Sequence, residues 1–352
     1  MPAQPARRVV TSLEVSRAAG VSRATVSRCF TDGAAVRRDT RARVIAAAQA
    51  LGYEPNLLAR MLNTRESNIV AVLTADFQNP FQPALMEALT GGLRSEGLVP
   101  LLMKSGSVDE PADDLIQLAL SYRVSAIVVT VLSASPAAIR RCVASDVPVI
   151  FLNRVAEETA AVNLCSDSGR GAARAAEVLV EGGRSRIAMI TGRTGTWSNS
   201  MRRGGFRQRL DELGFDAVGI EGGDFTYEGG RRAAAALLAG YPRLDAIYAC
   251  NDAMAFGALD AIRLSARRSV PQDVAVIGFD DVPVAAWAAY RLSTIRQPID
   301  ALIDEVRAVL RRPDRGLGLA GETILREGHF VQRATTVPVA MQAGDIDAAE
   351  AA

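Results

Sequence analysis

The stretch AAGVSRATVSRCF, residues 18–30, indicates the fold of the N-terminal part of the chain. Before it, apolar residues recur at helical spacing from Ser12 to Ala19. Gly20 then permits a tight turn, and Ser22 is a favoured N-cap residue for a second helix that runs to about Phe30. The sequence therefore predicts two short helices joined by a tight turn.

A third helix is predicted from Asp39 or Thr40 to Leu51, with Gly52 ending it. Two helices joined by a glycine-containing turn and packed on a third are typical of the helix-turn-helix plan. Residues 1–66 hold eleven arginines and five acidic residues, a net charge of +6, whereas the rest of the chain carries −5. A basic head on a mildly acidic body is typical of a module that binds a polyanion, although a solvated basic face is the alternative.

Residues 53–66 form a separate segment. Pro55 breaks the preceding helix, and residues 56–62 have helical potential over only about two turns. Helices shorter than about 12 residues are marginal in water unless they pack on something else. We therefore expect this helix to form only under some conditions.

From Asn68 onward, short β-rich runs alternate with amphipathic helical patterns. This alternation predicts parallel sheets covered by helices on both faces. It extends over about 270 residues, which is long for one compact domain, so we expect two doubly wound α/β lobes with a cleft. The predicted strands are Ile69–Leu73, Val99–Met103, Ala126–Val131, Val149–Leu152, Ile187–Thr191, Ala246–Ala249 and Val274–Gly278. The predicted helices lie near residues 83–96, 111–121, 136–145, 169–181, 200–212, 227–239 and 252–264.

Polar residues follow several of these predicted strands. Ligands of open α/β sheets bind beyond the carboxyl ends of the strands. Asp76, Asn153, Asn251 and Asp280 each come just after such a run. They are therefore candidates for the walls of the cleft.

Composition excludes several classes of protein. No run reaches the roughly 18 apolar residues of a membrane helix, and the N-terminus lacks a secretory hydrophobic segment, so we expect a cytoplasmic protein. The four cysteines have no C-x-x-C spacing and there is one histidine, so neither a metal site, nor a cofactor, nor histidine-based catalysis is expected. Residues 339–352 are rich in Ala, Asp and Gly without an apolar heptad, which predicts a disordered tail.

Over residues 9–338 the sequence resembles the LacI/GalR family of bacterial transcriptional regulators. The most specific stretches are AAGVSRATVSRCF (18–30) and TRARVIAAAQALGYEPNLLARML (40–62). Family landmarks then follow in order: DFQNPF (76–81), FLNR (151–154), DSGRGA (167–172), GDFT (223–226), ACNDAMAFGAL (249–259), VIGFDD (276–281) and STIRQP (293–298). The resemblance implies a small all-α helix-turn-helix domain, a two-lobed core like the periplasmic binding proteins, and a repressor rather than an enzyme.

The resemblance also implies that the second helix lies in the major groove of a palindromic or near-palindromic double-stranded operator. Arg23 and Ala24 would be the principal specificity residues, and Arg28 would read a guanine, because its fork can donate to both O6 and N7. At the position of Arg23, several family members have a larger polar or aromatic residue instead. The operator sequence that they prefer is therefore not expected to apply to this chain. Hydroxyl groups suit phosphate contacts that fix register, with helix capping as the alternative. These hydroxyls belong to Thr11, Ser22, Thr25 and Ser27.

Asn56–Leu62 resembles the family's hinge helix, of which two, one per subunit, enter the minor groove at the operator centre. Leu62 occupies the position of the leucine that opens the central base step. Ala59 is small enough for the two hinges to approach closely. The alternative is that Leu62 packs on the core.

By resemblance, a small-molecule effector, a sugar or sugar derivative, binds between the lobes. Arg202 would donate two hydrogen bonds to neighbouring hydroxyls, Asp280 would accept from two, and Phe225 would stack on the ring. The structural alternatives are core packing for Phe225 and capping for Asn251 and Asp280. Gln82 stands where the family often has an aromatic residue, which favours a more polar effector. The full set of effector positions is Asp76, Phe81, Asn153, Arg202, Phe225, Asn251 and Asp280.

Trp287 and the apolar stretch 284–290 fall in the family's subunit-interface region, which implies a homodimer, with packing inside the lobe as the alternative. A regulator with the same architecture that answers to a nucleobase or a phosphorylated metabolite is the first rival function. A sugar-binding transport protein would need an export signal and no basic head. An α/β enzyme would need a phosphate loop or a catalytic set, and neither motif occurs.

The predicted domains are a helix-turn-helix domain at 9–52, a hinge and linker at 53–67, a two-lobed core at 68–338 and the tail at 339–352. Within the core, the N-lobe comprises about 68–166 and 297–325. The C-lobe comprises about 167–296 and 326–338.

Overall fold

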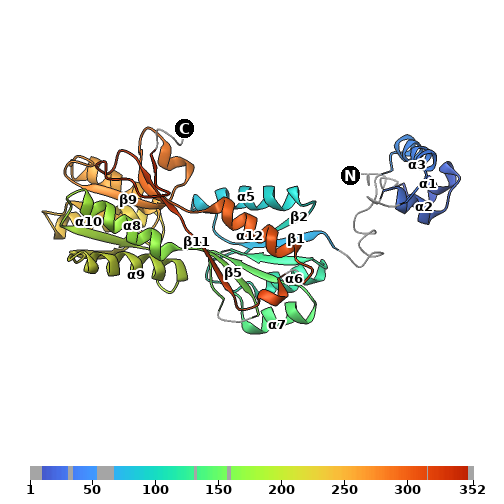
Figure 1. Ribbon diagram of the computed structural model, residues 1–352, viewed down its shortest axis with the longest axis horizontal. Helices are drawn as coiled ribbons and strands as arrows, with labels where there is room; N and C mark the ends of the chain where they lie inside the picture. The colour runs from blue at the N-terminus through green and yellow to red at the C-terminus, as the bar shows by residue number, and fades with distance from the viewer. Residues whose placement is uncertain are drawn as a thin grey trace, which may run out of the picture. The chain divides into compact units, whose positions relative to one another are not determined.

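The computed structural model of the protein describes residues 10–30, 35–53, 67–130, 133–156, 160–314 and 316–347. The chain divides into two compact units, residues 1–67 and 68–352. The first unit is helical, and the second contains two mainly parallel sheets with helices around them (Figure 1). The predicted fold class, a helix-turn-helix head and a two-lobed α/β core, is confirmed.

Three helices build the first unit. They are α1 (Ser12–Ala19), α2 (Arg23–Cys29) and α3 (Arg38–Leu51). Gly20 ends α1 with a φ of 64°, a left-handed conformation that a side chain would disfavour. Ser22 caps α2, since its Oγ accepts a hydrogen bond from the backbone N–H of Thr25 at 3.1 Å. The helices enclose a small core of Val15, Ala19, Val26, Cys29, Val44 and Ala48.

The N-lobe is built on a parallel sheet in the order β11-β5-β4-β3-β1-β2. Its strands are β1 (Ile69–Thr74), β2 (Val99–Lys104), β3 (Ala126–Val129), β4 (Val149–Leu152), β5 (Val162–Ser166) and β11 (Thr323–Arg326). Its helices are α5 (Phe81–Ser95), α6 (Asp113–Ser121), α7 (Pro136–Ala144) and α12 (Ile299–Arg311). Side chains alternate along β1, so Val70 and Val72 pack with α5 and α12, whereas Ala71 and Leu73 pack with α6 and α7. Figure 1 shows α5 and α12 together on one side of this sheet.

The C-lobe is built on a sheet in the order β13-β12-β10-β9-β8-β6-β7, parallel except between β10 and β12. Its strands are β6 (Ile187–Thr191), β7 (Gly219–Gly222), β8 (Ala246–Ala249), β9 (Ala275–Asp280), β10 (Ser293–Arg296), β12 (His329–Gln332) and β13 (Ile346–Asp347). Its helices are α8 (Ser168–Glu181), α9 (Trp197–Glu212), α10 (Tyr227–Gly240) and α11 (Asp252–Asp260). In both lobes the first five strands have the order 2-1-3-4-5, which is a common doubly wound topology.

The chain passes between the two sheets three times: between β5 and α8, between β10 and α12, and between β11 and β12. Each sheet is therefore completed by a segment that returns from the other lobe. The carboxyl ends of β1, β3 and β4 in the N-lobe and of β6 and β9 in the C-lobe lead into loops that share one cavity.

Six described strands and one α-helix lie outside the predicted elements: β5, β7, β10, β11, β12, β13 and α12. Most of these strands are short and carry polar residues, so they lack an apolar run that stands out. Asn163 on β5, for example, can be buried because hydrogen bonds within the N-lobe satisfy its amide.

The prediction of a disordered tail is wrong for residues 339–347. β13 pairs with β12, and the carboxylate of Asp345 accepts a hydrogen bond from the buried Arg174 at 2.8 Å. A tertiary partner, which composition cannot reveal, holds this segment. Residues 348–352 lie outside the described residues.

Candidate ligand cavity and DNA-binding surface

A cavity of about 330 Å³ lies between the N-lobe and the C-lobe. This volume is at the lower end of the roughly 300–1,000 Å³ found for small-molecule sites. Six of the seven predicted effector positions line it: Asp76, Phe81, Asn153, Arg202, Phe225 and Asp280. The cavity is therefore a candidate ligand site at the carboxyl ends of both sheets.

A chain of polar side chains crosses the cavity from one lobe to the other. Asn153, which follows β4, donates from Nδ2 to Oε1 of Gln297 at 2.8 Å. Gln297 donates from Nε2 to Oδ1 of Asp280 at 2.6 Å, and Asp280 is the last residue of β9. Gln297 lies in the STIRQP landmark but was not among the predicted contacts, because its position between the lobes follows only from the tertiary fold.

Arg202 and Asp280 form a buried ion pair in this chain, with 3.1 Å between Nη2 and Oδ1. The guanidinium of Arg202 also donates from Nη1 to the carbonyl oxygen of Cys250 at 2.6 Å and lies 3.8 Å from the ring centroid of Phe279. Burial raises the pKa of Asp280, and the nearby Arg202 and Gln297 act in the opposite direction. The pair presents a guanidinium and a carboxylate side by side, an arrangement that can both donate to and accept from a ligand.

Asp252, the first residue of α11, is a second buried carboxyl that interacts electrostatically with Asp280. Its Oδ2 accepts from the backbone N–H of Val282 at 2.9 Å and its Oδ1 from the hydroxyl of Thr294 at 2.5 Å. Burial, and then the charge of Asp280, raise the pKa of Asp252 to about 8. The raised pKa favours the neutral form of this carboxyl, which lowers the negative charge next to Asp280.

Aromatic rings form part of the cavity wall. Phe225 adopts a φ of 63° and lies so close to Gly192 that a Cβ there would come within 2.1 Å of the ring. Phe81, the first residue of α5, is buried, and its backbone N–H donates to Oδ1 of Asn79 at 3.1 Å. Trp197, the first residue of α9, also lines the cavity, although sequence reasoning had not selected it.

Asn251 is not among the residues described as lining the cavity. It caps α11, where its Oδ1 accepts from the backbone N–H of Met254 at 3.0 Å and its Nδ2 donates to the carbonyl of Phe225 at 3.2 Å. Both ends of the amide are thus used within the protein. The observed contacts of Asn251 are therefore those of a helix cap, which was the alternative to an effector contact.

Asp76 reaches the cavity from the loop after β1. Its Oδ1 accepts from the backbone N–H groups of Gln78 at 2.9 Å and Asn79 at 3.3 Å. This turn shapes the loop that leads into α5 and Phe81. Its carboxylate is therefore already partly used in holding the cavity wall.

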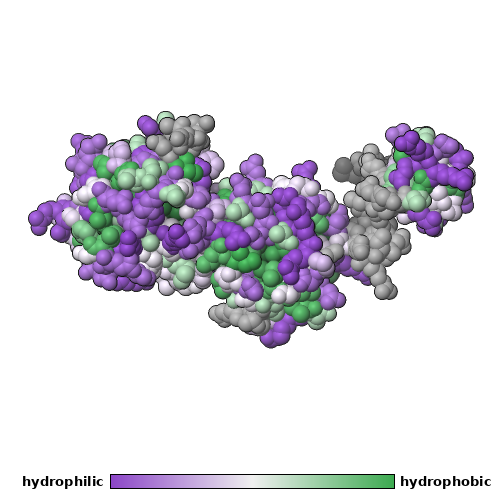
Figure 2. All heavy atoms as spheres, viewed as in Figure 1, coloured by the Kyte–Doolittle hydropathy of each residue, from purple (hydrophilic) through white to green (hydrophobic). Residues whose placement is uncertain are grey.

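The exposed side of α2 carries the predicted base-reading residues. Arg23, Ala24, Ser27 and Arg28 are all exposed, whereas Val26 and Cys29 face the core. Figure 2 shows a mostly hydrophilic surface on the side of this unit that faces the viewer. The helix thus has one exposed side that can face DNA and one apolar side packed on the core, as docking in a groove requires.

The predicted phosphate-binding hydroxyls also have partners within the unit. The Oγ of Ser22 lies 2.9 Å from Oγ1 of Thr25, and Thr11 donates from its hydroxyl to Oε2 of Glu14 at 3.1 Å. These groups stabilise the helix starts, and their phosphate contacts stay predictions. The predicted hinge residues Asn56, Ala59 and Leu62 lie outside the described residues.

Two kinds of feature are absent from the described part of the chain. No group of three or more His, Cys, Asp or Glu residues there could hold a metal ion. No helix in that part is both long enough and apolar enough to cross a membrane.

Two family models match the chain. Residues 12–56 match the model of bacterial regulatory proteins of the lacI family. Residues 66–299 match the model of periplasmic binding proteins and the sugar-binding domain of the LacI family.

Individual relatives cover nearly the whole chain. The ribose operon repressor of Bacillus subtilis (strain 168) is 31% identical over 329 residues, which is 93% of this chain and 99% of that protein. The transcriptional regulator CelR of Thermobifida fusca is 31% identical over 339 residues, 93% of this chain and 98% of that protein. Both are regulators and not enzymes.

Solved structures agree with these relatives. The lac repressor dimer bound to operator and the anti-inducer ONPF superposes with a TM-score of 0.83 at 25% identity, over 94% of this chain and 100% of that one. A complex of the transcriptional regulator CelR with cellobiose gives a TM-score of 0.67 at 28% identity, over 93% and 99% of the two chains. With its helix-turn-helix head, two-lobed core and inter-lobe cavity, this chain belongs to the lacI family of bacterial regulatory proteins and is a DNA-binding transcriptional regulator.

Proposed function

We propose that the protein is a cytoplasmic, homodimeric repressor whose affinity for a palindromic or near-palindromic operator is set by a neutral sugar or sugar derivative bound between its lobes. The observation that carries the proposal is the buried Arg202–Asp280 pair, joined through Gln297 to Asn153 of the other lobe. Paired hydroxyls of a sugar match a donor and an acceptor placed side by side. A ligand that engages them touches both lobes at once.

The charges around the cavity favour a neutral ligand over a phosphorylated one. Its charged lining residues are Asp76, Asp109, Asp224 and Asp280 against Arg154, Arg193 and Arg202. Arg202 is paired with Asp280, and Arg193 is paired with Asp109 at 3.0 Å. A phosphate would enter a site with more carboxylates than guanidinium groups, which is electrostatically unfavourable.

The relatives support the sugar class. One is a ribose operon repressor, and CelR was solved as a complex with cellobiose. The buried Gln82 in the cavity wall adds a polar group where a purely stacking ligand would need an apolar one. These points together favour a polyhydroxyl effector over a nucleobase.

Control of DNA binding follows from the three crossings between the lobes. An effector that changes the angle between the lobes moves Asn68, the residue from which the N-lobe and the hinge segment diverge. The predicted hinge helix of about two turns would be marginal by itself, so a small displacement of its attachment would be enough to favour or disfavour it. A coupling of about 1–3 kcal/mol changes operator occupancy roughly 5- to 150-fold.

A thermal-shift screen tests the effector class. The probes are D-ribose, D-galactose, cellobiose and lactose, compared with adenine, guanine and ribose 5-phosphate. We expect stabilisation by at least one sugar and loss of that response in Asp280→Ala. The variant Asp211→Ala, an exposed aspartate on α9, is the control and should respond as the wild type does.

The outcome separates the candidates. Stabilisation by a base alone, or by the phosphorylated sugar alone, would replace the neutral-sugar proposal by the corresponding rival. Fluorescence anisotropy with a labelled fragment of the protein's own promoter region, with and without the active probe, then tests repression. Equal affinity in both conditions would rule out control by that molecule.

A further inference from the structure

Two consecutive residues beside the cavity have left-handed backbone conformations. Asp280 has a φ of 128° and Asp281 a φ of 57°. Neither is a glycine, so this backbone conformation is energetically unfavourable for both residues. It persists only where surrounding contacts hold it. Asp280 is the residue whose carboxylate faces Arg202 and the cavity.

The carboxylate of Asp281 is held between two arginines. Its Oδ2 accepts from Nε of Arg296 at 2.6 Å, and its Oδ1 lies 2.6 Å from Nη1 of Arg333. The Asp281 and Arg333 side chains are only 4% and 7% exposed, whereas that of Arg296 is 37% exposed. Two opposite charges on one buried carboxylate leave it little freedom to rotate.

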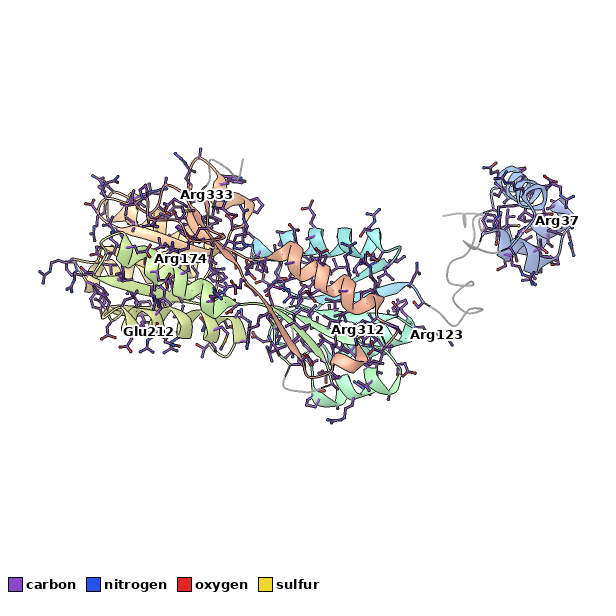
Figure 3. The ribbon with its side chains drawn as sticks, viewed as in Figure 1. Arg37, Arg123, Arg174, Glu212, Arg312 and Arg333 are labelled. Carbon is purple, nitrogen blue, oxygen red and sulfur yellow. The ribbon has the colours of Figure 1, made fainter. Side chains whose placement is uncertain are left out.

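The arginines are themselves fixed. Arg333, labelled in Figure 3, donates from Nη1 to the carbonyl of Leu292 at 2.8 Å, and its backbone N–H donates to Oγ of Ser293 at 2.9 Å. Arg296 is the last residue of β10 and directly precedes Gln297. The clamp therefore ties Asp281, which directly follows β9 and Asp280, to the crossover segment that carries Gln297.

We propose that Asp281 is a positioning residue of the effector site: its two-arginine clamp holds Asp280 in the strained backbone conformation that places the Asp280 carboxylate against Arg202 and Gln297. This inference rests on the proposed function for its consequence in effector binding. Its geometric part does not, because the conformation of Asp280 can be observed without any ligand. Asp281 is outside the described cavity lining, so its effect on binding would be transmitted through its neighbour.

The chain offers a matched control. Glu96, at the end of α5 in the N-lobe, is also held by two arginines, Arg307 and Arg311, each donating from Nε at 2.8 Å. Its side chain is 17% exposed and it is not among the cavity-lining residues. Glu96→Gln thus removes the same kind of clamp from a place with no contact to the site.

The first test compares crystal structures of Asp281→Asn, Glu96→Gln and the wild type, all without ligand. We expect Asp281→Asn to release Asp280 from its left-handed φ and to lengthen the Arg202–Asp280 contact beyond 4 Å, with no such change in Glu96→Gln. An unchanged Asp280 in Asp281→Asn would overturn the proposal. If Asp281→Asn does not fold, Arg296→Gln replaces it, since Arg296 is the most exposed member of the clamp.

The second test measures binding of D-ribose, D-galactose, cellobiose and lactose by calorimetry. For any sugar that the wild type binds, we expect at least tenfold weaker binding in Arg296→Gln and Asp281→Asn, less than twofold change in Glu96→Gln, and substantial recovery in Arg296→Lys, which keeps the charge. Equal losses of sugar affinity in the Glu96 and Asp281 variants would mean that the clamp contributes only to the general stability of the protein and does not position the site. Failure of the wild type to bind any of the four would count against the proposed sugar effector, while the crystal comparison would still decide the role of Asp281.

Discussion

Burial distinguishes Asp280 and Arg202 from the other charged residues that line the cavity. Asp280 and Arg202 are each about 95% buried, so both have lost most of their water and depend on each other and on Gln297. Breaking a buried pair is costly because the remaining charge has no partner. A ligand that enters the cavity must therefore offer polar groups in return, which is a source of specificity.

At the residue scale, Asp252 predicts a pH dependence of stability. Its pKa is raised from 3.8 to about 8, so between these values the folded protein keeps a proton that the unfolded chain releases. The wild type therefore loses stability as the pH rises through this window, by up to about 1.4 kcal/mol per unit. Asp252→Asn has no such proton. Its amide oxygen can accept from the backbone N–H of Val282, and its amide nitrogen can donate to the hydroxyl of Thr294, which donates to Asp252 in the wild type and would have to reverse.

We expect the melting temperature of Asp252→Asn, minus that of the wild type, to increase from pH 5 to pH 8 and to level off above. Differential scanning calorimetry across this range measures it, with Asp211→Asn as the exposed control. A difference that stays constant with pH would contradict the raised pKa of Asp252.

Arg28 predicts sequence-specific loss of DNA binding. If Arg28 makes the predicted bidentate contact to guanine, Arg28→Ala should bind the operator about 1–3 kcal/mol more weakly, with little selective loss on unrelated DNA. Arg17→Ala, an exposed arginine in the last turn of α1, removes the same charge and is the control. Anisotropy titrations on operator and scrambled duplexes measure these affinities. If Arg28→Ala and Arg17→Ala lost the same affinity on the operator and on the scrambled duplex, base reading by Arg28 would be excluded.

At the scale of elements, β13 closes one edge of the C-lobe sheet. Its pairing with β12 covers backbone groups that would otherwise form an open edge. Arg174, labelled in Figure 3, links this strand to α8 through hydrogen bonds to Asp345 at 2.8 Å and to the carbonyl of Ala340 at 3.1 Å. Glu177 and Glu181 also contact Arg174, so it keeps some partners without the tail.

Truncation after Pro338 should therefore destabilise the C-lobe. We expect a loss of about 1–3 kcal/mol, from an under-paired arginine and an open strand edge, together with more aggregation. Urea unfolding measures the loss, and truncation after Asp347 is the control because it keeps β13. Equal stability of the two truncated proteins would show that the tail contributes nothing to the fold.

At the scale of the whole molecule, exposed apolar side chains on the C-lobe indicate a surface for self-association. Trp287 is 60% exposed and Leu264 is 74% exposed in the single chain. The alternative that Trp287 packs inside its lobe does not match this exposure. Large exposed aromatic residues are the usual anchors of protein interfaces.

We expect Trp287→Asp to weaken dimerisation by about 30-fold or more, the equivalent of roughly 2 kcal/mol for an interface anchor. Sedimentation velocity over a range of concentrations measures the change. Ile220→Asp, at a 39% exposed site on β7, is the control. A wild-type protein that is monomeric at all concentrations, or equal effects of both substitutions, would remove Trp287 from the interface.

Prediction from sequence worked best where local chemistry decides the structure. α1 has the predicted bounds, Ser22 caps α2, and Gly52 ends α3, because turn and cap residues act on their immediate neighbours. Seven apolar runs correspond to strands. Six of these strands are buried, and a buried parallel strand is apolar on both faces, whereas β2 lies at a sheet edge and is largely exposed. The polar strands escaped prediction because their stability comes from partners distant in sequence. α12 did not have to escape it, since its buried residues Leu302, Ile303, Val306 and Val309 recur at helical spacing.

The amino-acid sequence by itself determined the two kinds of unit. Its family resemblance also selected seven effector positions, and six of them line one cavity. Only the tertiary structure decided that the amide of Asn251 also donates to the carbonyl of Phe225, that Gln297 joins the lobes, and that Asp345 holds the tail on Arg174. The physical reason is range: capping and hydrophobic periodicity involve residues a few positions apart. Hydrogen bonds between buried polar groups join residues more than a hundred positions apart, such as Asn153 and Gln297, and they exist only once the lobes are assembled.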